Sequence, residues 1–209
     1  MPVILTFGDS NTHGSPPMTD RMTYERYDAA TRWPQVMARA LGWDLVEEGL
    51  PGRTAQFPDP CMDGMMDGAP ALRQALQSHG PLDALTIMLG TNDVKTRFGA
   101  SPETVMGGVA CLLDLATGIE LQTRHGGFKI LLICPPPVVE TGILAPDFWG
   151  AAAKSQALAP LYADLAASRG VGFLDAGQVI SVSPVDGVHF SAESHARLGQ
   201  AVAESVRRL

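Results

Sequence analysis

The sequence predicts an α/β protein in which helices cover both faces of a parallel, five-stranded sheet. Short runs of Val, Ile and Leu alternate with longer helical patterns along the 209 residues. Strands that are apolar throughout are typical of sheets buried on both faces, and strand–helix alternation is typical of parallel sheets. No internal repeat, low-complexity tract or linker interrupts the pattern. We therefore expect one domain over residues 1–209.

Five short runs have the length and composition of strands. In chain order they are residues 3–7, 44–48, 84–89, 129–134 and 171–175. The first, third and fourth are nearly continuous in apolar side chains, as expected of buried parallel strands. The second carries Asp44, Glu47 and Glu48 and is the least apolar of the five. Three prolines at 135–137 stop the fourth strand, because proline cannot donate to a sheet ladder.

Five longer segments have helical patterns. They are residues 32–41, 69–79, 102–124, 151–169 and a last helix that begins after Ser191 and runs almost to Leu209. Pro34 suits the first turn of the first helix. The second helix is closed by Gly80 and Pro81, and Gly170 is a natural end for the fourth. The side chain of Ser191 can cap the last helix.

Composition and charge narrow the class of partner. Hydrophobic residues make up 45% of the chain and charged residues 18%, which is too apolar for a disordered protein. The formal net charge is -7, and no basic cluster is longer than Arg207-Arg208. This balance argues against nucleic acid or an anionic membrane as the main partner. No stretch reaches the roughly 18 to 20 apolar residues of a membrane span.

The cysteines and the N-terminus bear on the compartment. Cys61, Cys111 and Cys134 are widely spaced and form no C-x-x-C pair, so we expect neither a disulfide framework nor a zinc site. Cys111 and Cys134 lie among apolar residues and are expected to act as small core residues. The N-terminus lacks the basic region of a signal peptide and starts directly on a strand-like run. These features predict a reduced, cytoplasmic setting.

Five candidate catalytic residues follow the predicted strands. Ser10 follows the first strand, Gly52 the second and Asn92 the third, while Asp186 and His189 come after the fifth. In sheets of this kind, ligands bind outside the carboxyl ends of the strands. We therefore expect all five residues to meet on one rim of the sheet.

Ser10, His189 and Asp186 are the components of a nucleophilic hydrolase. A serine hydroxyl is a poor nucleophile until a base takes its proton, and His189 is the natural base. A carboxylate must hold the imidazole in one tautomer, and Asp186 lies three residues before it, a spacing that brings the two together in a turn. Asp9 is a second carboxylate, but as the neighbour of Ser10 it is expected to shape the turn.

Attack on a carbonyl creates an oxyanion, which needs preorganised hydrogen-bond donors. The candidates are the backbone N–H groups of Ser10 and Gly52 and the side-chain amide of Asn92. Gly52 suits a position where the backbone must approach the substrate closely. Together these donors predict an oxyanion hole beside the serine.

Each of these signals taken singly also fits an ordinary turn or a helix-entry residue, but that explanation does not account for all of them on one rim.

His195 lies six residues after His189 and raises a metal site as an alternative, although no Cys or regular carboxylate pattern accompanies the pair. The motifs G-x-S-x-G, G-x-G-x-x-G and G-x-x-x-x-G-K-[ST] are absent. We therefore expect no metal and no cofactor.

Four blocks of sequence carry a resemblance to a known family. They are Gly-Asp-Ser-Asn at 8–11, Gly-Leu-Pro-Gly at 49–52, Gly-Thr-Asn-Asp at 90–93 and Asp-Gly-Val-His at 186–189. In this order, and spanning nearly the whole chain, they resemble the blocks of the SGNH hydrolases, also called the GDSL esterase family. The resemblance implies a flavodoxin-like, three-layer α/β/α sandwich. It also implies Ser10, Gly52 and Asn92 at the oxyanion and Asp186 and His189 as the other triad members.

A narrower set of residues is similar to the bacterial arylesterases of this family. The set comprises residues 47–50, 87–93, 135–137 and 186–190. Some of these enzymes also transfer acyl groups to alcohols in water, and several assemble as octamers. The resemblance therefore implies acyl transfer and a homo-oligomer, with the octamer as one form.

Three positions depart from the family pattern. Asn11 stands where the family name has Leu, a side chain that is not catalytic. Glu48 stands where many members carry Asn, which bears on the hydrogen bonding behind the oxyanion hole. Gly52 stands where transferase-type relatives can carry Ala, which bears on the strength of acyl transfer.

These observations predict a serine esterase that acts on a small-molecule ester with a short acyl group, through an acyl-enzyme on Ser10. The loops at 62–68 and 138–150 are expected to line the pocket, with His13 a further candidate. Two enzymatic alternatives stay open: a carbohydrate acetylesterase, and a thioesterase or lysophospholipase that favours long acyl chains. A non-enzymatic binding or scaffold module is disfavoured because every required side chain is present.

Overall fold

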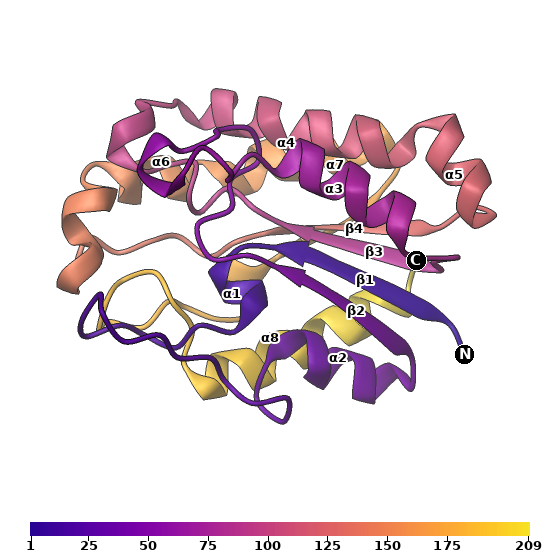
Figure 1. Cartoon of the computed structure of the whole chain (residues 1–209), viewed down its shortest axis with the longest axis horizontal. Helices are drawn as coiled ribbons and strands as arrows, with labels where there is room; N and C mark the ends of the chain where they lie inside the picture. The colour runs from indigo at the N-terminus through magenta and orange to yellow at the C-terminus, as the bar shows by residue number, and fades with distance from the viewer.

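A computed structural model describes residues 1–209, and its centre is a parallel sheet of five strands (Figure 1). The strands are β1 Val3–Gly8, β2 Asp44–Gly49, β3 Ala84–Met88, β4 Lys129–Cys134 and β5 Gly172–Asp175. Their order across the sheet is β2-β1-β3-β4-β5. The predicted fold class is confirmed, and β1 lies between β2 and β3, so the residues that follow these three strands are neighbours in space.

Helices form a layer on each face of the sheet. They are α1 Ser10–His13, α2 Trp33–Leu41, α3 Gly68–Ser78, α4 Pro102–Thr117, α5 Ile119–His125, α6 Ala151–Gln156, α7 Leu158–Arg169 and α8 Ala192–Val206. Short 3₁₀ turns add η1 Pro60–Met62, η2 Thr96–Phe98, η3 Gly142–Phe148 and η4 Ala176–Gln178. Figure 1 shows α2 and α8 on one face, with α3, α4 and α7 on the other. Each layer encloses its own hydrophobic core, and the core beneath the three helices is the larger.

Several predicted helix ends are confirmed in detail. Pro34 lies in the first turn of α2, and Ser191 caps α8 by accepting a hydrogen bond from the N–H of Ser194 at 3.1 Å. Helix α7 ends at Gly170, which has the left-handed φ of +62° that favours glycine. These ends depend on local chemistry, which is why the sequence predicts them.

Two predicted helices are each divided in two. The segment 102–124 breaks at Gly118, whose extended backbone ends α4 and starts α5 with a bend of 50°. The segment 151–169 breaks at Ala157, between α6 and α7. Pro160 has no N–H to donate to the carbonyl of Gln156, so the first helix cannot continue through it. The prediction of single helices here was wrong.

Cys134 is buried, as predicted, but Cys111 is exposed on the outer face of α4. The apolar neighbours of Cys111 in the sequence belong to the opposite, buried face of the same helix.

No single helix is long and apolar enough to cross a membrane, and only the bent pair α4 and α5 passes that test when counted together. Helix α4 buries one face against α3 and α7.

Candidate active site

Ser10 lies in a tight turn at the carboxyl end of β1. Asp9 caps the short helix α1 by accepting the N–H of Asn11 at 2.9 Å, which confirms the predicted role of Asp9 in shaping the turn. Gly8 is required before it, because a Cβ there would lie 2.1 Å from Oγ1 of Thr12. The turn therefore places the Ser10 side chain on the rim of the sheet.

Asp186 and His189 are held together by the turn that contains them. Oδ1 of Asp186 accepts the backbone N–H groups of Val188 and His189, each at 3.0 Å. Gly187 has φ +72°, and a Cβ there would lie 1.7 Å from the carbonyl oxygen of Val139. The turn thus needs glycine at 187, and it brings the carboxylate beside the imidazole before either contacts Ser10.

The three predicted triad residues form a continuous hydrogen-bonded row. Nδ1 of His189 donates to Oδ2 of Asp186 at 2.6 Å, and Nε2 of His189 lies 3.0 Å from Oγ of Ser10. All three side chains are buried. Burial by itself would raise the pKa of Asp186, but the hydrogen bonds and charge of His189 and the N–H of Met18 hold it below its ordinary value. An ionised Asp186 keeps the proton on Nδ1, so Nε2 is free to accept the serine proton.

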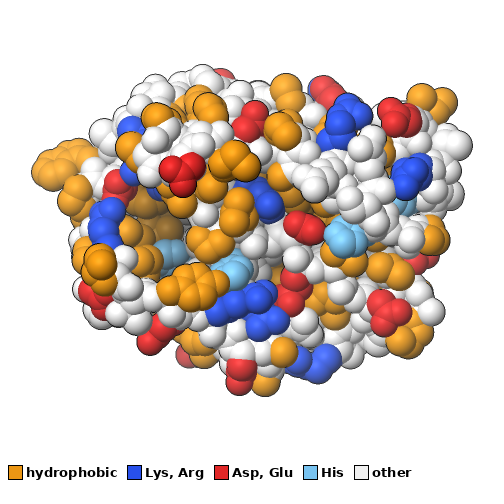
Figure 2. Space-filling view, viewed as in Figure 1, with side chains coloured by type: hydrophobic (Ala, Val, Ile, Leu, Met, Phe, Trp, Pro, Cys, Tyr) orange, Lys and Arg blue, Asp and Glu red, His pale blue; other side chains and the backbone are white.

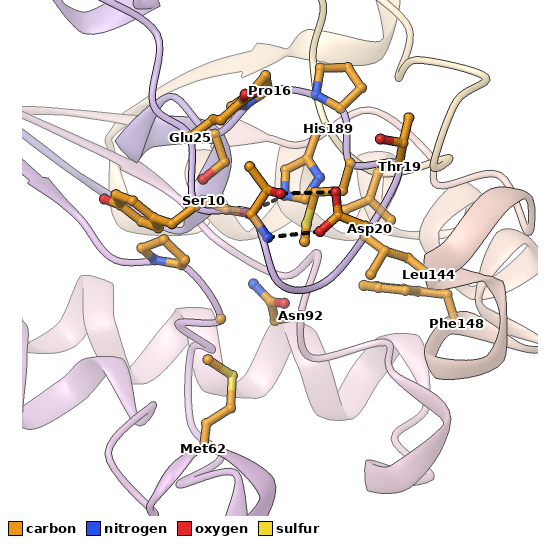
Figure 3. A pocket seen from close by; sticks show the side chains of 18 of the residues that line it. Ser10, Pro16, Thr19, Asp20, Glu25, Met62, Asn92, Leu144, Phe148 and His189 are labelled. Carbon is orange, nitrogen blue, oxygen red and sulfur yellow. Dashed lines mark hydrogen bonds between the residues drawn. The ribbon is translucent and has the colours of Figure 1, made fainter.

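The two other oxyanion-hole candidates face the same space. Gly52 has φ +89°, and its backbone N–H donates no hydrogen bond within the protein. Nδ2 of Asn92 donates to the carbonyl of Arg53 at 3.0 Å, which fixes the plane of the amide, and lies 3.5 Å from Oδ2 of Asp9. Figure 3 shows Asn92 beside Ser10 and His189 at one cavity. Gly52 and Asn92 can thus present donors to an oxygen formed at Ser10.

These residues open onto a cavity of about 310 Å³. On the face seen in Figure 2 it is a hollow with many hydrophobic side chains around it. Met62, Leu144 and Phe148 line it, so the two predicted loops do contribute to the pocket. The prediction that His13 lines the cavity was wrong; its Nε2 is bonded at 2.6 Å to the hydroxyl of Tyr24, which does line it.

One wall of the cavity has no counterpart in the sequence analysis. Most of the segment 15–25 lines the cavity, and the N–H of Met18 donates to Oδ2 of Asp186 at 2.7 Å. The segment has neither helical nor strand periodicity. Its pair of prolines at 16–17 was the only signal of an ordered, extended path across the site.

Two of the departures from the family pattern have structural consequences. Nδ2 of Asn11 donates to the carbonyl of Val188 at 3.1 Å, so it ties the turn of Ser10 to the turn of His189. Oε1 of Glu48 lies 3.1 Å from Nε2 of His79, so this carboxylate turns away from the oxyanion hole. Nη1 of Arg53 donates to the backbone carbonyls of Gly8 and Glu48. The support behind the oxyanion hole therefore comes from Arg53.

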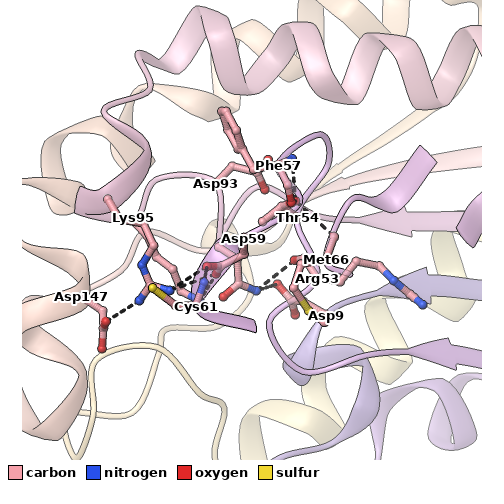
Figure 4. A network of polar contacts seen from close by, with 12 residues as sticks. Asp9, Arg53, Thr54, Phe57, Asp59, Cys61, Met66, Asp93, Lys95 and Asp147 are labelled. Atoms are coloured by element: carbon pink, nitrogen blue, oxygen red, sulfur yellow. Dashed lines mark hydrogen bonds and ion pairs between the residues drawn. The ribbon is translucent and has the colours of Figure 1, made fainter. Parts of the chain in front are cut away.

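Two buried carboxyl groups lie beneath the site (Figure 4). Burial raises the pKa of Asp9 to about 6, although the N–H of Asn11 and nearby positive charges oppose this. Burial also raises the pKa of Asp93 to about 7, with a further contribution from Asp9, while the N–H of Ala55 opposes it. Near neutral pH this pair therefore carries less charge than two ordinary aspartates.

No group of three or more His, Cys, Asp or Glu side chains is arranged to hold a metal ion. His195, which raised the metal alternative, is fully buried in α8, and its Nδ1 accepts the backbone N–H of Trp33 at 3.2 Å. Burial lowers the pKa of His195 to about 4. Its place in the structure is that of a core residue joining α8 to α2.

A parallel α/β sheet that presents a histidine-paired serine at its carboxyl rim is the arrangement of a serine hydrolase. The chain belongs to the GDSL-like lipase/acylhydrolase family, whose sequence profile matches residues 6–197. A comparison with curated protein sequences found no match.

Several solved structures are similar over the whole chain. The aryl esterase of M. smegmatis is 38% identical with a TM-score of 0.94, and the match covers 100% of both chains. The carbohydrate acetylesterase Est24 of Sinorhizobium meliloti is 36% identical with a TM-score of 0.93, covering 100% of this chain and 99% of the other. The chain is therefore similar both to an aryl esterase and to a carbohydrate acetylesterase, two enzymes named for different substrates.

Replacing Asn92 with alanine is expected to lower kcat by about 10²- to 10³-fold, with a smaller change in KM. The reason is that the oxyanion exists only near the transition state, so the lost donor weakens the transition state more than substrate binding. Steady-state kinetics on a p-nitrophenyl ester measures both constants. A variant with unchanged kcat and a raised KM would show that Asn92 binds the ground state instead.

For Asp93→Asn, the free energy of unfolding relative to that of the wild type is expected to increase as the pH rises. Because the pKa of Asp93 is raised from 3.8 to about 7, the folded protein keeps a proton that the unfolded chain releases. The wild type loses this contribution between about pH 4 and about pH 7, whereas the variant has no group to titrate there.

Urea unfolding at about pH 5 and about pH 8 tests this prediction. The free energy of unfolding of the variant, relative to the wild type, should be higher at the upper pH by at least about 1 kcal/mol. Asp164→Asn, at an exposed position on α7, is the matched control. A relative stability of Asp93→Asn that is the same at both pH values would contradict the raised pKa.

Proposed function

We propose that the protein is a serine esterase of arylesterase type that hydrolyses short acyl esters through an acyl-enzyme on Ser10. The observation that carries the proposal is the row Asp186–His189–Ser10, with separations of 2.6 and 3.0 Å, whose Ser10 and His189 line an open cavity. A carboxylate, an imidazole and a hydroxyl in this arrangement generate a nucleophile at neutral pH.

In the first half of the reaction, Oγ of Ser10 attacks the ester carbonyl while Nε2 of His189 takes the hydroxyl proton. The carbonyl oxygen becomes an oxyanion and accepts hydrogen bonds from the N–H groups of Ser10 and Gly52 and from Nδ2 of Asn92. His189 then gives its proton to the leaving alcohol, the carbon–oxygen bond breaks, and the acyl group stays on Ser10.

In the second half, a water molecule attacks the acyl-enzyme and His189 takes its proton. Collapse of the second tetrahedral intermediate returns the proton to Oγ of Ser10 and releases the carboxylic acid. If an alcohol attacks in place of water, the product is a new ester, which is the acyl transfer that the family resemblance predicts. Product analysis in the presence of an alcohol measures the ratio of the two outcomes.

The size of the cavity favours short acyl groups. A volume of about 310 Å³ is near the lower end of the range for small-molecule sites, and it must hold both the acyl and the alcohol portions. Met62, Leu144 and Phe148 supply apolar contacts, as an acyl chain or an aryl ring requires.

The test is hydrolysis of p-nitrophenyl esters from acetate to palmitate, with Ser10→Ala as the control. We expect the rate to peak at acetate or butyrate and to vanish in the variant. A peak at long chains would favour a thioesterase or lysophospholipase. The absence of any Ser10-dependent rate would favour a binding module without enzymatic activity.

A carbohydrate acetylesterase is the second candidate, and a specific observation favours it. The polar side chains of Asp20, Thr23 and Glu25 also line the cavity and could bind sugar hydroxyl groups. The similarity to Est24 points the same way. A comparison of kcat/KM for phenyl acetate and acetylated xylose separates the two candidates.

Assembly is a separate prediction. Met22, Tyr24 and Trp149 are large hydrophobic side chains that are exposed in the single chain. Exposed side chains of this kind are frequent at subunit interfaces, which is consistent with the homo-oligomer that the resemblance implies. Size-exclusion chromatography with light scattering measures the number of subunits, and a monomer would contradict the prediction.

A further inference from the structure

Lys95 is a buried cation in the wall of the proposed active-site cavity. Its backbone N–H donates to the carbonyl of Asn92 at 3.2 Å, so one turn carries both residues, and both line the cavity with Ser10. Only 8% of Lys95 is exposed. Its ammonium group makes no hydrogen bond within the protein. A lysine with three free donors therefore faces the space in which the ester would bind.

The nearest carboxylate does not satisfy this charge. Oδ2 of Asp59 is 3.9 Å from Nζ of Lys95, beyond hydrogen-bond distance. Asp59 is bound instead by Arg97, whose Nη1 lies 3.0 Å from both carboxylate oxygens. Arg97 also pairs with Asp147, and Asp147 pairs with Arg21.

This network leaves one positive charge without a hydrogen-bonded carboxylate. Two carboxylates, those of Asp59 and Asp147, are matched by the two guanidinium groups of Arg97 and Arg21. Lys95 is the third cation, and its ion pair is the 3.9 Å one with Asp59, a carboxylate that Arg97 already binds. Burial, followed by the charge of Arg97, holds the pKa of Lys95 below its ordinary value, although the carboxylates of Asp59, Asp147 and Asp9 oppose this.

The remaining neighbours of the ammonium group do not replace such an acceptor. The ring of Phe148 is 5.9 Å from Nζ, a distance at which the attraction between a cation and an aromatic ring is weak. Asp20 and Glu25 also line the cavity, but both are exposed, and solvent screens their charge. Oδ1 of Asp20 accepts the backbone N–H groups of Met22 and Thr23, each at 2.8 Å.

We propose that Lys95 forms an anion subsite of the cavity and binds a carboxylate carried by the acyl or the alcohol portion of the substrate. The inference rests on the proposed function and narrows it to esters that bear a negative charge close to the scissile bond. A substrate carboxylate would supply the acceptor that the ammonium group lacks, and hydrogen bonds between two charged groups are stronger than those between neutral groups.

The experiment compares esters that differ in charge but closely match in size. For the alcohol portion the pair is p-carboxyphenyl acetate and p-carbamoylphenyl acetate. For the acyl portion it is the p-nitrophenyl monoester of glutarate and its methyl ester. In each pair the ratio of kcat/KM for the anionic ester to that for the neutral one is measured in the wild type, Lys95→Met, Lys95→Gln and Lys95→Arg. Because the ratio is taken within one preparation, a loss of folded protein cancels.

We expect the ratio for one pair to fall by about tenfold or more in Lys95→Met and Lys95→Gln, and to be largely kept in Lys95→Arg. Lys129→Met makes the same change in net charge at an exposed position at the start of β4, and its ratio should equal that of the wild type. Equal ratios in the wild type and in both neutral Lys95 variants, for both pairs, would overturn the proposal.

A measurement on the wild type alone gives a second test. Benzoate should inhibit the turnover of phenyl acetate more strongly than benzamide does, and equal inhibition would count against the subsite. The failure of this inference is distinct from the failure of the proposed function. If only this inference fails, hydrolysis depends on Ser10, but the ratio of kcat/KM for anionic and neutral esters does not depend on Lys95. If the proposed function fails, no Ser10-dependent hydrolysis of any ester is found.

Discussion

Replacing Ser10 with alanine is expected to lower kcat on short acyl esters by roughly a million-fold, the loss seen when a triad serine is removed in another hydrolase. The variant retains the donors of the oxyanion hole but has no oxygen to form the acyl-enzyme. The fold should be unaffected, because the only hydrogen bond of the Ser10 hydroxyl is to Nε2 of His189. The variant should therefore unfold at nearly the same temperature as the wild type.

The measurement is steady-state hydrolysis of p-nitrophenyl acetate, together with labelling by a serine-reactive fluorophosphonate. Ser168→Ala, at an exposed position on α7, is the matched control and should keep both the rate and the labelling. An active Ser10→Ala protein, or one that is still labelled at the wild-type rate, would show that another nucleophile is in use.

Replacing Asp186 with asparagine is expected to lower kcat by about 10⁴-fold. The physical reason is the tautomer of His189. Oδ2 of Asp186 accepts the proton of Nδ1 at 2.6 Å, and an amide NH₂ group in its place would require Nδ1 to be the acceptor. The proton would then lie on Nε2, which could no longer accept the proton of Ser10.

Asp186→Asn is also expected to change the hydrogen bond to Met18, an effect that goes beyond the loss of the negative charge. Oδ2 of Asp186 also accepts the N–H of Met18 at 2.7 Å, so an NH₂ group there would oppose a second donor. We therefore expect KM to rise along with the fall in kcat, because Met18 belongs to the segment 15–25 that walls the cavity. Asp164→Asn is the control, and a loss of less than about tenfold in kcat would contradict the assigned role of Asp186.

The parts of the protein that follow from local chemistry could be predicted from the sequence. The five strands, the cap at Ser191 and the end at Gly170 depend on side chains within one element. The meeting of Ser10, Gly52, Asn92 and His189 at one cavity was predictable as well. Strands of a parallel sheet have their carboxyl ends on the same side, so residues that directly follow them share a rim.

Features that depend on contacts between distant segments could not be predicted. The break at Ala157, the wall formed by the segment 15–25 and the burial of Asp9 beside Asp93 have no periodic signal in the chain. Lys95 is the clearest case. In the sequence it is a single lysine three residues after Asn92, and whether its charge is satisfied depends on Asp59, which lies 36 positions away.

Short-range spacing and the geometry of parallel strands are therefore sufficient to specify the sheet, the helical layers and the set of residues that gather at the rim. The volume of the cavity, the protonation of the buried Asp9 and Asp93 and the absence of a hydrogen-bonded carboxylate at Lys95 follow only from the packing of distant segments. Each of these depends on which groups exclude water from one another, and that is a property of the packed molecule and not of any one segment.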